Sequence, residues 1–600
     1  MKVDSIHKTV LTLLFAFSVA GAAQNPNGAA IFQQNCAVCH QDGSATRAPS
    51  PDTLHKLSRD LIVGTLESGV MKVEGSKLTR EDRLAVAEFL SSAVANVPKP
   101  RAGFCEAKQA PALNDPGWTS WGADPSNSRF QSDTVSGLNL SNVPRLQLKW
   151  AFGFQGAAAT YGQPTVFGGR VYAGSEDGTV YSLDAKTGCI YWTFKAPATV
   201  KTAVVADDSG RAVFFGDVGG NVYALDSASG SVLWKARADP HPAARITGSP
   251  VYFAGRLFVP VSSGEEGAAV DSKYPCCTFR GSVVALDAQT GQQIWKAYTI
   301  PRNAHPLGRR NSAGTELWGP SGGAVWSSPT IDPKLHAVYV ASGNSYSDPP
   351  NPYTDAVIAF NLNSGKMLWS HQLTANDRWN IACVAPDQGN CPPNPGHDFD
   401  FGAPPLLRAL PGGRDILIAA QKSGIIYGLD PAHQGRIIWT SRIGKGGPLG
   451  GVEWGGSADQ ERVYLPLADW DPIDQSAGGG LFALQIATGK RAWYAPPVRP
   501  ACLNQNGCSA AQSSPTTVIP GVVFAGSEDG HLRAHDSQTG RVIWDFDTLK
   551  EFKTINAVEA HGGSMNATGP AIAGGMLYVD AGYTNNISGN VLLAFSVDGK

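Results

Sequence analysis

A tryptophan-bearing motif repeats along most of this 600-residue chain and restricts its fold more than any other sequence feature. Each copy has an apolar stretch, a Leu-Asp or similar pair and a turn glycine, commonly followed four residues later by Trp, as in residues 180–192 and 222–234. The turn glycines of the eight copies are Gly188, Gly230, Gly291, Gly365, Gly435, Gly489, Gly540 and Gly599. Their mean spacing of about 59 residues is typical of small sheets arranged around an axis. We therefore predict a mainly β chain with an eight-bladed β-propeller.

The two ends of the repeat region predict how the ring closes. Seven of the glycines precede a repeat tryptophan: Trp192, Trp234, Trp295, Trp369, Trp439, Trp493 and Trp544. Gly599 has no such partner, whereas residues 146–150 end in Lys-Trp without a preceding turn. A strand from this segment would complete the last blade and remove an exposed sheet edge. We expect closure between residues 146–152 and 591–600, with one structural Trp per blade packed between neighbouring sheets.

The composition agrees with a chain of strands and loops. Charged residues make up 16% of the chain, against about 25% in an average globular protein. The 68 glycines favour turns over surface helices, and the 48 basic and 50 acidic residues nearly cancel. This balance disfavours a disordered chain, a long coiled coil and a surface that coats nucleic acid.

Residues 1–23 have the pattern of a secretory signal peptide. Lys2 and Lys8 precede an apolar run over residues 10–20, and small residues at 20–23 suit a cleavage site. The run is shorter than the roughly 20 residues that a membrane-spanning helix needs. We expect export to the periplasm or secretion, without a membrane span. An ordinary N-terminal core helix is the alternative.

Residues 24–97 are predicted to form a small all-α domain of the class I cytochrome c type. Cys36, Cys39 and His40 form a C-x-x-C-H motif, in which two thioethers attach haem c and the imidazole binds its iron. Met71 is the candidate second axial ligand, and a methionine that merely fills a gap is the alternative.

The remaining boundaries follow from helix and linker signals. Thr79 is a candidate N-cap for the helix that closes the small domain. The Pro-containing stretch at its end predicts a linker over residues 98–117, before the propeller domain at 118–600.

An exported chain with ten cysteines is expected to contain disulfides. Two of the ten are required by the haem. Short loops separate Cys383 from Cys391 and Cys502 from Cys508, so each of these pairs is expected to form a local disulfide.

The propeller segment resembles one known family. The L-D-x-x-T-G-x-x-x-W pattern is similar to the tryptophan-docking motif of PQQ-dependent quinohaemoprotein alcohol dehydrogenases, and the resemblance covers residues 118–600. The segment 118–130 is similar to the start of that family's propeller. An N-terminal cytochrome and the C-C-T-F-R-G sequence at 276–281 are most similar to the branch that oxidises polyvinyl alcohol.

This resemblance implies a vicinal disulfide at the quinone site. In the family, such a ring lies against one face of pyrroloquinoline quinone (PQQ) and an indole covers the other. Cys276 and Cys277 match the ring, and Trp326 matches the indole. Pairing of either cysteine with Cys105 or Cys189 is the alternative, and the pairing of the latter two stays open.

The resemblance also implies cations beside the quinone, since PQQ carries three carboxylates. Arg280 matches a carboxylate-binding Arg, and Lys422 matches the cation near the quinone oxygens. A solvated surface charge is the alternative for each. Trp454 matches a late hub tryptophan, although Glu453 stands where an Asn is common.

Calcium and a catalytic base complete the implied site. Glu266 and Asn344 match the oxygen ligands of the family's calcium, with Glu265 as the alternative if the loop is shifted by one residue. The family's D-x-W-D base motif is altered, because Asn380 stands at its last position. Since Asn cannot act as a base near neutral pH, Asp377 is the candidate base and another carboxylate is the alternative.

Together, these features predict an exported dehydrogenase. We expect oxidation of secondary alcohols in polyvinyl alcohol or similar polyols, with electrons passing through PQQ and haem c to a soluble cytochrome c or similar acceptor. A PQQ-dependent sugar or aldehyde dehydrogenase is one alternative. A cofactor-free propeller scaffold, similar to outer-membrane assembly lipoproteins, is another.

Overall fold

A computed structural model describes residues 26–41, 48–67, 69–91, 102–107, 109–112, 117–471 and 473–600. The predicted signal peptide at 1–23 lies outside these residues, as do residues 98–101, 108 and 113–116 of the predicted linker at 98–117. Within them, no helix is both long and apolar enough to cross a membrane.

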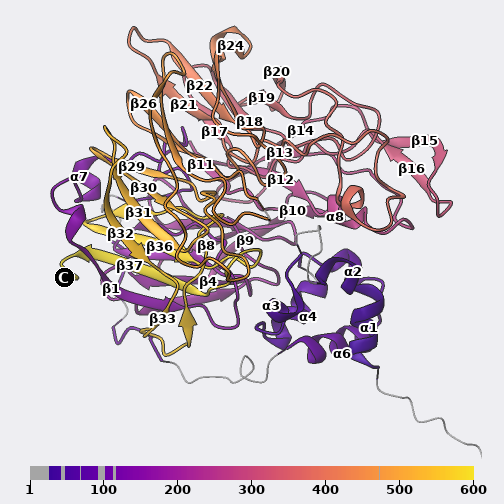
Figure 1. Cartoon of the computed structure of the whole chain (residues 1–600), viewed down its shortest axis with the longest axis horizontal. Coiled ribbons are helices and arrows are strands. Elements are labelled where there is room, and N and C mark those ends of the chain that lie inside the picture. Colours follow the sequence, from indigo (N-terminus) through magenta and orange to yellow (C-terminus); the bar gives the residue numbers. More distant parts are fainter. Residues whose placement is uncertain are drawn as a thin grey trace, which may run out of the picture.

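The chain from residue 146 onward forms eight antiparallel sheets around a common axis, as predicted (Figure 1). Sheet 1 consists of β2 (Thr165–Phe167), β3 (Arg170–Gly174), β4 (Thr179–Asp184) and β5 (Ile190–Lys195), and sheet 2 of β6 (Val205–Ala206), β7 (Ala212–Gly216), β8 (Asn221–Asp226) and β9 (Val232–Arg237). Sheet 3 consists of β10 (Ala244–Arg245), β11 (Val251–Phe253), β12 (Arg256–Ser263), β13 (Ser282–Asp287) and β14 (Gln293–Tyr298). Sheet 4 consists of β17 (Thr330–Asp332), β18 (Ala337–Ala341), β19 (Ala356–Asn361) and β20 (Met367–Gln372).

Sheet 5 consists of β21 (Leu406–Ala409), β22 (Asp415–Ala420), β23 (Ile425–Asp430) and β24 (Arg436–Arg442), and sheet 6 of β25 (Ser457–Ala458), β26 (Arg462–Pro466), β27 (Leu481–Gln485) and β28 (Arg491–Ala495). Sheet 7 consists of β29 (Thr517–Ile519), β30 (Val522–Gly526), β31 (His531–Asp536) and β32 (Val542–Asp547). Sheet 8 consists of β35 (Ala571–Ala573), β36 (Met576–Ala581), β37 (Val591–Val597) and β1 (Leu146–Gly153). Two hairpins, β15 (His305–Arg310) with β16 (Glu316–Gly319) and β33 (Glu551–Phe552) with β34 (Ala560–His561), leave the blades.

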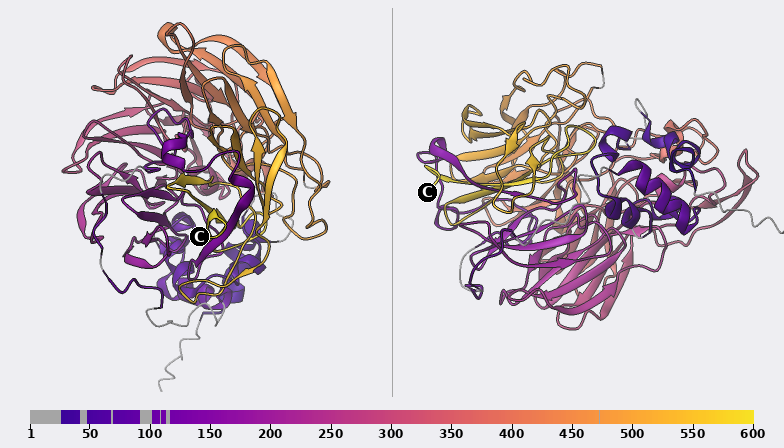
Figure 2. Two further views of the ribbon diagram at one scale, coloured as in Figure 1. Left: turned by 90° about the vertical axis from the view of Figure 1, so that its left-hand side faces the viewer. Right: turned by 90° about the horizontal axis from the view of Figure 1, so that it is seen from below.

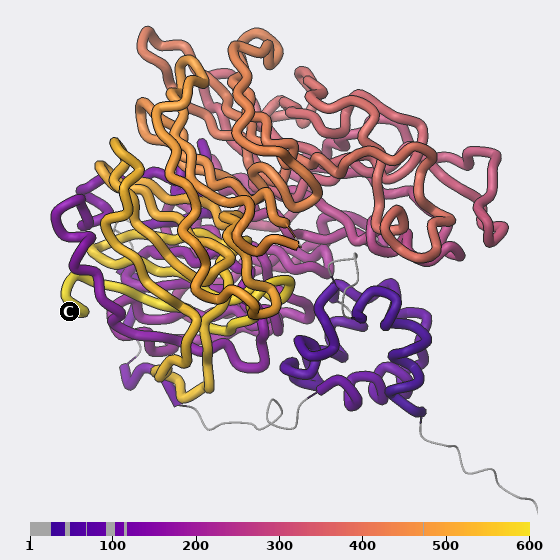
Figure 3. The backbone as a smooth tube through the Cα atoms, viewed as in Figure 1, coloured from indigo at the N-terminus to yellow at the C-terminus, as the bar shows by residue number. Residues whose placement is uncertain are grey.

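The ring closes at the predicted place. β1 pairs antiparallel with β37, from Leu146 opposite Val597 to Gly153 opposite Val591, so the last blade takes its outer strand from the start of the propeller. Figure 3 shows this violet segment beside the yellow C-terminal strand. The sequence-based closure is therefore confirmed.

The repeat tryptophans join each blade to the next. The Trp234 indole N–H donates to the carbonyl of Ala288, and the Trp192 indole makes the same contact with Ser227, at 2.9 Å each. Trp150, on the closing strand, donates to Ala185 at 3.2 Å. Each indole also covers the turn glycine that follows the accepting residue: a Cβ on Gly291 would lie 2.6 Å from the Trp234 ring. The Trp-Gly pattern is thus a contact between blades.

The small N-terminal domain is helical, as predicted. Its helices are α1 (Gly28–Asn35), α2 (Ala37–His40), α3 (Pro51–Leu54), α4 (Arg59–Glu67), α5 (Lys72–Gly75) and α6 (Arg80–Leu90). Thr79 caps α6 and exchanges hydrogen bonds with Asp82, which confirms the predicted N-cap. Phe32, Leu61 and Val86 form its core with neighbouring apolar side chains.

The helical domain packs against one side of the propeller, opposite the side where the C-terminus lies (Figures 1 and 2). Ala158 of the propeller joins its apolar core, and Lys77 forms an ion pair with Asp271. Two propeller loops border a cavity of the helical domain, through Gly267 in α8 (Glu265–Ala268) and Ile381 in the 3-10 turn η3 (Ile381–Val384). Further short helices, α7 (Asp133–Ser136), η2 (Val143–Arg145) and η4 (Pro431–His433), lie outside the blades.

Eight of the ten cysteines form four disulfides. The local pairs Cys383–Cys391 and Cys502–Cys508 are present as predicted, as is the vicinal pair Cys276–Cys277. The structure also pairs Cys105 with Cys189, which the sequence left open. The alternative in which Cys276 or Cys277 bonds a distant cysteine is therefore wrong.

Replacement of a turn glycine tests the contact between blades. Gly291→Ala is expected to destabilise the protein more than Gly255→Ala, because both glycines have positive φ but only the Gly291 position meets an indole. The difference should be about 1–3 kcal/mol, the usual cost of overpacking. Equilibrium urea unfolding measures it, and equal losses in the two variants would contradict the role of the contact.

Candidate active site

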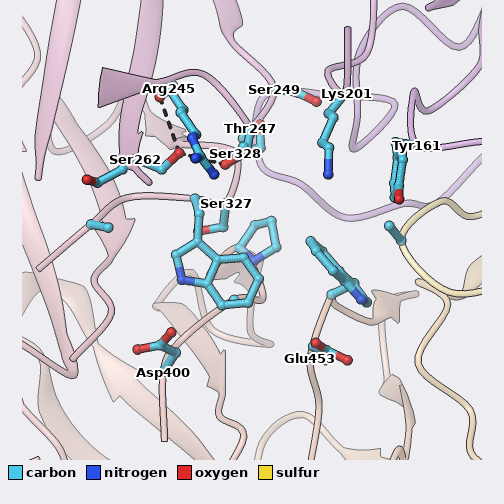
Figure 4. A pocket seen from close by; sticks show the side chains of 18 of the residues that line it. Tyr161, Lys201, Arg245, Thr247, Ser249, Ser262, Ser327, Ser328, Asp400 and Glu453 are labelled. Atoms are coloured by element: carbon cyan, nitrogen blue, oxygen red, sulfur yellow. Dashed lines mark hydrogen bonds between the residues drawn. The ribbon is translucent and has the colours of Figure 1, made fainter. Parts of the chain in front are cut away.

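Loops from most of the blades enclose a cavity of about 270 Å³ at the centre of the ring. Trp326 and Trp454 line it, and their rings meet edge to face with centroids 5.2 Å apart. Figure 4 shows Arg245 and Lys201 pointing into the cavity from one side and Asp400 and Glu453 from the other. The two predicted indoles therefore share one pocket whose opposite walls carry opposite charges.

Three cations face this cavity. Lys422 is buried, with its Nζ 3.1 Å from Asp398 and 3.6 Å from Asp400, and it lies 5.7 Å from the centre of the Trp326 ring. Burial lowers the pKa of Lys201 to about 8. Arg245, the third, is also desolvated. A site with three buried or half-buried cations is suited to a polyanionic ligand.

Arg280 makes its contacts away from the cavity wall. Its guanidinium donates to the carbonyls of Ile300 and Pro301 and stacks on Tyr298 at 3.9 Å, and it is not part of the cavity wall. Arg245 and Lys201 supply the positive wall instead. The sequence analysis missed both, because neither belongs to the repeat or to the cysteine motif.

The vicinal disulfide is likewise not on the cavity wall. Cys276 and Cys277 are buried in an apolar cluster that also contains Phe279 and Tyr346. The reason is local: Glu265 accepts the backbone N–H groups of residues 278 and 279 at 2.7 and 2.8 Å and holds this segment inside the blade. The pairing was predicted correctly, and the disulfide shares its apolar cluster with Trp326 and Tyr346, which do line the cavity.

A carboxylate at the cavity and an amide bonded to the cavity residue Asp400 suit a hard cation. Glu266 lines the cavity. Asn344 donates through its side chain to the Trp379 carbonyl and through its backbone to Asp400, while its buried Oδ1 accepts no hydrogen bond. Such an orphaned oxygen fits a cation ligand, which is the predicted role of Asn344.

Glu265, the alternative ligand, is fully buried and already satisfied by Tyr274 and the backbone. Burial raises the pKa of Tyr346, and the nearby carboxylates of Glu266 and Asp400 raise it further. Both carboxylates therefore lie near the Tyr346 phenol. Among the described residues, no group of three or more His, Cys, Asp or Glu side chains is arranged to hold a metal. A cation here would therefore depend on the amide as well as on carboxylates.

Asp377, the predicted base, is bonded to the backbone beside the cavity. It lies outside the cavity wall, and its two carboxylate oxygens accept the backbone N–H groups of Asp398 and Phe399 at 3.1 and 2.7 Å. Asn380 is buried and bonded to the backbone of Tyr346. Asp377 therefore supports the turn that presents Asp400 to the cavity.

Asp398 and Asp400 were not predicted as site residues, because only the altered motif around Asn380 was considered for the base. The signal that could have found them is the alternating run His-Asp-Phe-Asp-Phe at residues 397–401. Gly402 follows it directly, and a Cβ there would come within 2.0 Å of the Trp326 ring. The acidic turn and the indole thus fix each other's position.

The predicted haem residues lie together in the helical domain. Cys36, Cys39, His40 and Met71 line one cavity of about 580 Å³, and neither cysteine is in a disulfide. His40 Nδ1 lies 2.8 Å from the Pro49 carbonyl oxygen, so donation from Nδ1 leaves Nε2 for the iron. Burial lowers the pKa of His40, which favours the neutral imidazole that a metal requires. The residues present fit haem c.

Comparison with known proteins gives three family matches. Residues 118–388 match the model described as glucose/ethanol/alcohol dehydrogenase, β-propeller domain. Residues 280–599 match that of outer membrane protein assembly factor BamB, and residues 23–90 match that of cytochrome c oxidase, cbb3-type, subunit III. The matches agree with the propeller and cytochrome seen in the structure.

Curated relatives match nearly the whole chain. A polyvinylalcohol dehydrogenase of Pseudomonas sp is 40% identical over 98% of this chain and 97% of its own. Another, of Sphingopyxis sp. strain 113P3, is 38% identical over 96% and 94%. Among solved structures, the quinohemoprotein alcohol dehydrogenase from Comamonas testosteroni covers 82% of each chain at 21% identity with a TM-score of 0.61, which is a likeness of fold.

Met71→Ala tests the second axial ligand. The variant should lose the weak sulfur-to-iron absorption band of the oxidised protein, and its haem potential should fall, because a thioether ligand raises that potential. Met367→Ala, in β20 of the propeller, is the control and should leave both unchanged. An unaltered haem spectrum in Met71→Ala would remove Met71 as the ligand.

Proposed function

Since the chain belongs to the polyvinyl alcohol dehydrogenases, within the PQQ-dependent quinohaemoprotein alcohol dehydrogenase family, we propose that its substrate is a secondary hydroxyl of polyvinyl alcohol or a similar polyol. Its electrons would pass through haem c to a soluble one-electron carrier such as a cytochrome c. The predicted signal peptide and the four disulfides support a periplasmic location. Membership of an enzyme family excludes the cofactor-free scaffold alternative.

The observation that carries the proposal is the divided charge of the central cavity. Arg245 and Lys201 face it from one side and would hold carboxylates of PQQ against the Trp326 ring. Lys422 lies near the acidic turn and would approach the quinone oxygens. The Trp454 ring packs edge to face against Trp326 and limits the movement of that indole.

Calcium would be held by Glu266 and the orphaned Oδ1 of Asn344. Both supply the oxygen atoms that Ca²⁺ prefers. The hydrogen bond from the Asn344 backbone N–H to Asp400, at 2.6 Å, keeps the Asp400 carboxylate beside this pair. Calcium in this position would polarise an oxygen of its ligand as a Lewis acid.

Asp400 is the proposed base. Oxidation of a secondary alcohol to a ketone releases two electrons and two protons, and bound PQQ supplies the two-electron acceptor. Asp400 would take the hydroxyl proton, with the Lys422 ammonium 3.6 Å from its carboxylate to balance the charge. Asp377 would act as a positioning residue, because it holds the backbone of residues 398 and 399.

Reconstitution with PQQ and Ca²⁺ tests both the substrate and the base. In the wild type, polyvinyl alcohol and short secondary alcohols are expected to reduce the haem, whereas sugars are not. Asp400→Asn should lower kcat by about 10²–10⁴-fold, the usual contribution of a general base. Asp377→Asn is the matched variant and should lose less activity, because its amide keeps one of the two acceptor oxygens that hold the same turn.

Two results would contradict the proposal. A wild type active only on sugars or aldehydes removes the polyol substrate. Near-normal turnover of Asp400→Asn, together with an inactive Asp377→Asn, returns the role of base to Asp377.

A further inference from the structure

A second cavity, of about 370 Å³, lies between the helical domain and the propeller. Gln41, Ser50 and Thr53 line it from the helical domain, and loops of the propeller form the rest. Glu453 and Tyr583 line both this cavity and the central one. The two cavities therefore share a wall, and a long substrate in the first would extend toward the second.

The chemistry of this second cavity suits a neutral, hydroxyl-rich chain. Its lining has amides, hydroxyls and the partly exposed Trp470, with Glu453 and Glu528 as its charged groups and no Lys or Arg among the described residues. Exposed Asn506 and Asn585 offer donors and acceptors to an incoming ligand. An anionic ligand would meet only like charge here.

The wall between the cavities is built by hydrogen bonds. The Trp454 indole N–H donates to Asn566 Oδ1 at 2.6 Å, and Asn566 donates to the Glu528 carboxylate at 2.6 Å. Asn586 donates to the other Glu528 oxygen at 2.9 Å. Burial raises the pKa of Glu528 to about 7. A side chain at the central cavity is thus linked to the floor of the second one.

We propose that the second cavity is a subsite for a polyhydroxylated chain, which binds hydroxyls beyond the carbinol being oxidised. This rests on the proposed function and extends it from the reacting hydroxyl to the neighbouring ones. The helical domain is then part of the substrate site as well as the carrier of the haem.

The test compares kcat/KM for polyvinyl alcohol with kcat/KM for a short secondary alcohol. The ratio should fall about tenfold in the double variant Asn506→Ala, Asn585→Ala, which loses hydrogen bonds that only the longer substrate can make. Trp470→Ala should lower it in the same direction. Gln538→Ala removes an exposed amide on an outer turn and should leave the ratio unchanged.

A second measurement is independent of turnover. Binding of polyvinyl alcohol oligomers to the protein without PQQ, followed by tryptophan fluorescence, should weaken in the same variants. An unchanged ratio and unchanged binding would overturn the subsite while alcohol oxidation persists. A wild type that oxidises short alcohols but neither binds nor oxidises the polymer would overturn the subsite and the polymer substrate together.

A different observation concerns Arg245, which lines both the central cavity and the haem cavity. Its Nη2 donates to the carbonyl of Val70, the residue before Met71. Glu74, on the haem side, and Glu266, on the propeller side, both favour its charged form. One side chain thus contacts the backbone next to the axial methionine and faces the proposed quinone site.

Gly264 gives this guanidinium its space. A Cβ on Gly264 would lie 2.0 Å from Arg245 Nη2, although the φ of Gly264, −100°, is open to any residue. The packing of Arg245, rather than the backbone conformation, therefore requires glycine at this position. Gly264→Ala would displace the guanidinium without a change of charge.

We propose that Arg245 is a positioning residue that couples the two cofactor sites, so that an anion bound in the central cavity changes the haem potential. Carboxylates that attract the guanidinium would reduce the positive field near the iron and alter the hydrogen bond to Val70. Because binding couplings are reciprocal, the redox state of the haem would also change the affinity for PQQ.

Spectroelectrochemistry of the haem tests this without substrate. Addition of PQQ and Ca²⁺ to the wild type should lower the haem potential. In Arg245→Gln the potential without PQQ should already be lower, and the PQQ-dependent shift should be lost. Gly264→Ala should lose the shift too.

Lys77→Gln is the matched control, because it breaks the Lys77–Asp271 ion pair at the edge of the same haem cavity. It should keep the PQQ-dependent shift. Two results would overturn the coupling through Arg245. One is a PQQ-dependent shift of the haem potential that persists in Arg245→Gln with PQQ bound. The other is a loss of that shift in Lys77→Gln as large as in Arg245→Gln.

Discussion

The packing of each repeat tryptophan on the turn glycine of the next blade holds the whole structure together. The indole donates to a carbonyl of the neighbouring blade and needs the space that a side chain at the glycine would fill, as for Trp234 and Gly291. Six such contacts join successive blades, and Trp150 on Gly188 adds the seventh, which closes the ring. Because the ring is closed, loops from distant parts of the chain meet at one central cavity.

Chemistry in this protein comes from those loops and not from the repeat. Asp377 holds the turn of Asp398 and Asp400, and Gly402 admits Trp326 beside it. Arg245 faces the same cavity and also contacts the helical domain. Two buried contacts therefore support the cavity. The Asp377 carboxylate holds the acidic turn, and the Arg245 guanidinium links the cavity to the helical domain.

The sequence predicted the features that depend on local pattern. Eight blades, the closing strand, the Thr79 cap and the gathering of Cys36, Cys39, His40 and Met71 follow from spacing alone. Trp326, Lys422 and Glu266 also reached the expected cavity. The contacts of loop side chains could not be predicted, because tertiary packing decides them. Arg280 stacks on Tyr298, Glu265 accepts backbone N–H groups next to the disulfide, and Asp377 accepts those of the acidic turn.

We propose that PQQ lies on Trp326 between the Arg245–Lys201 wall and Asp400. A crystal structure of the protein with PQQ and Ca²⁺ tests this most directly. We expect a quinone stacked on Trp326, with its carboxylates at Arg245 and Lys201 and a cation at Glu266 and Asn344. A quinone bound outside this cavity, or one whose carboxylates pair with Arg280, would contradict this placement.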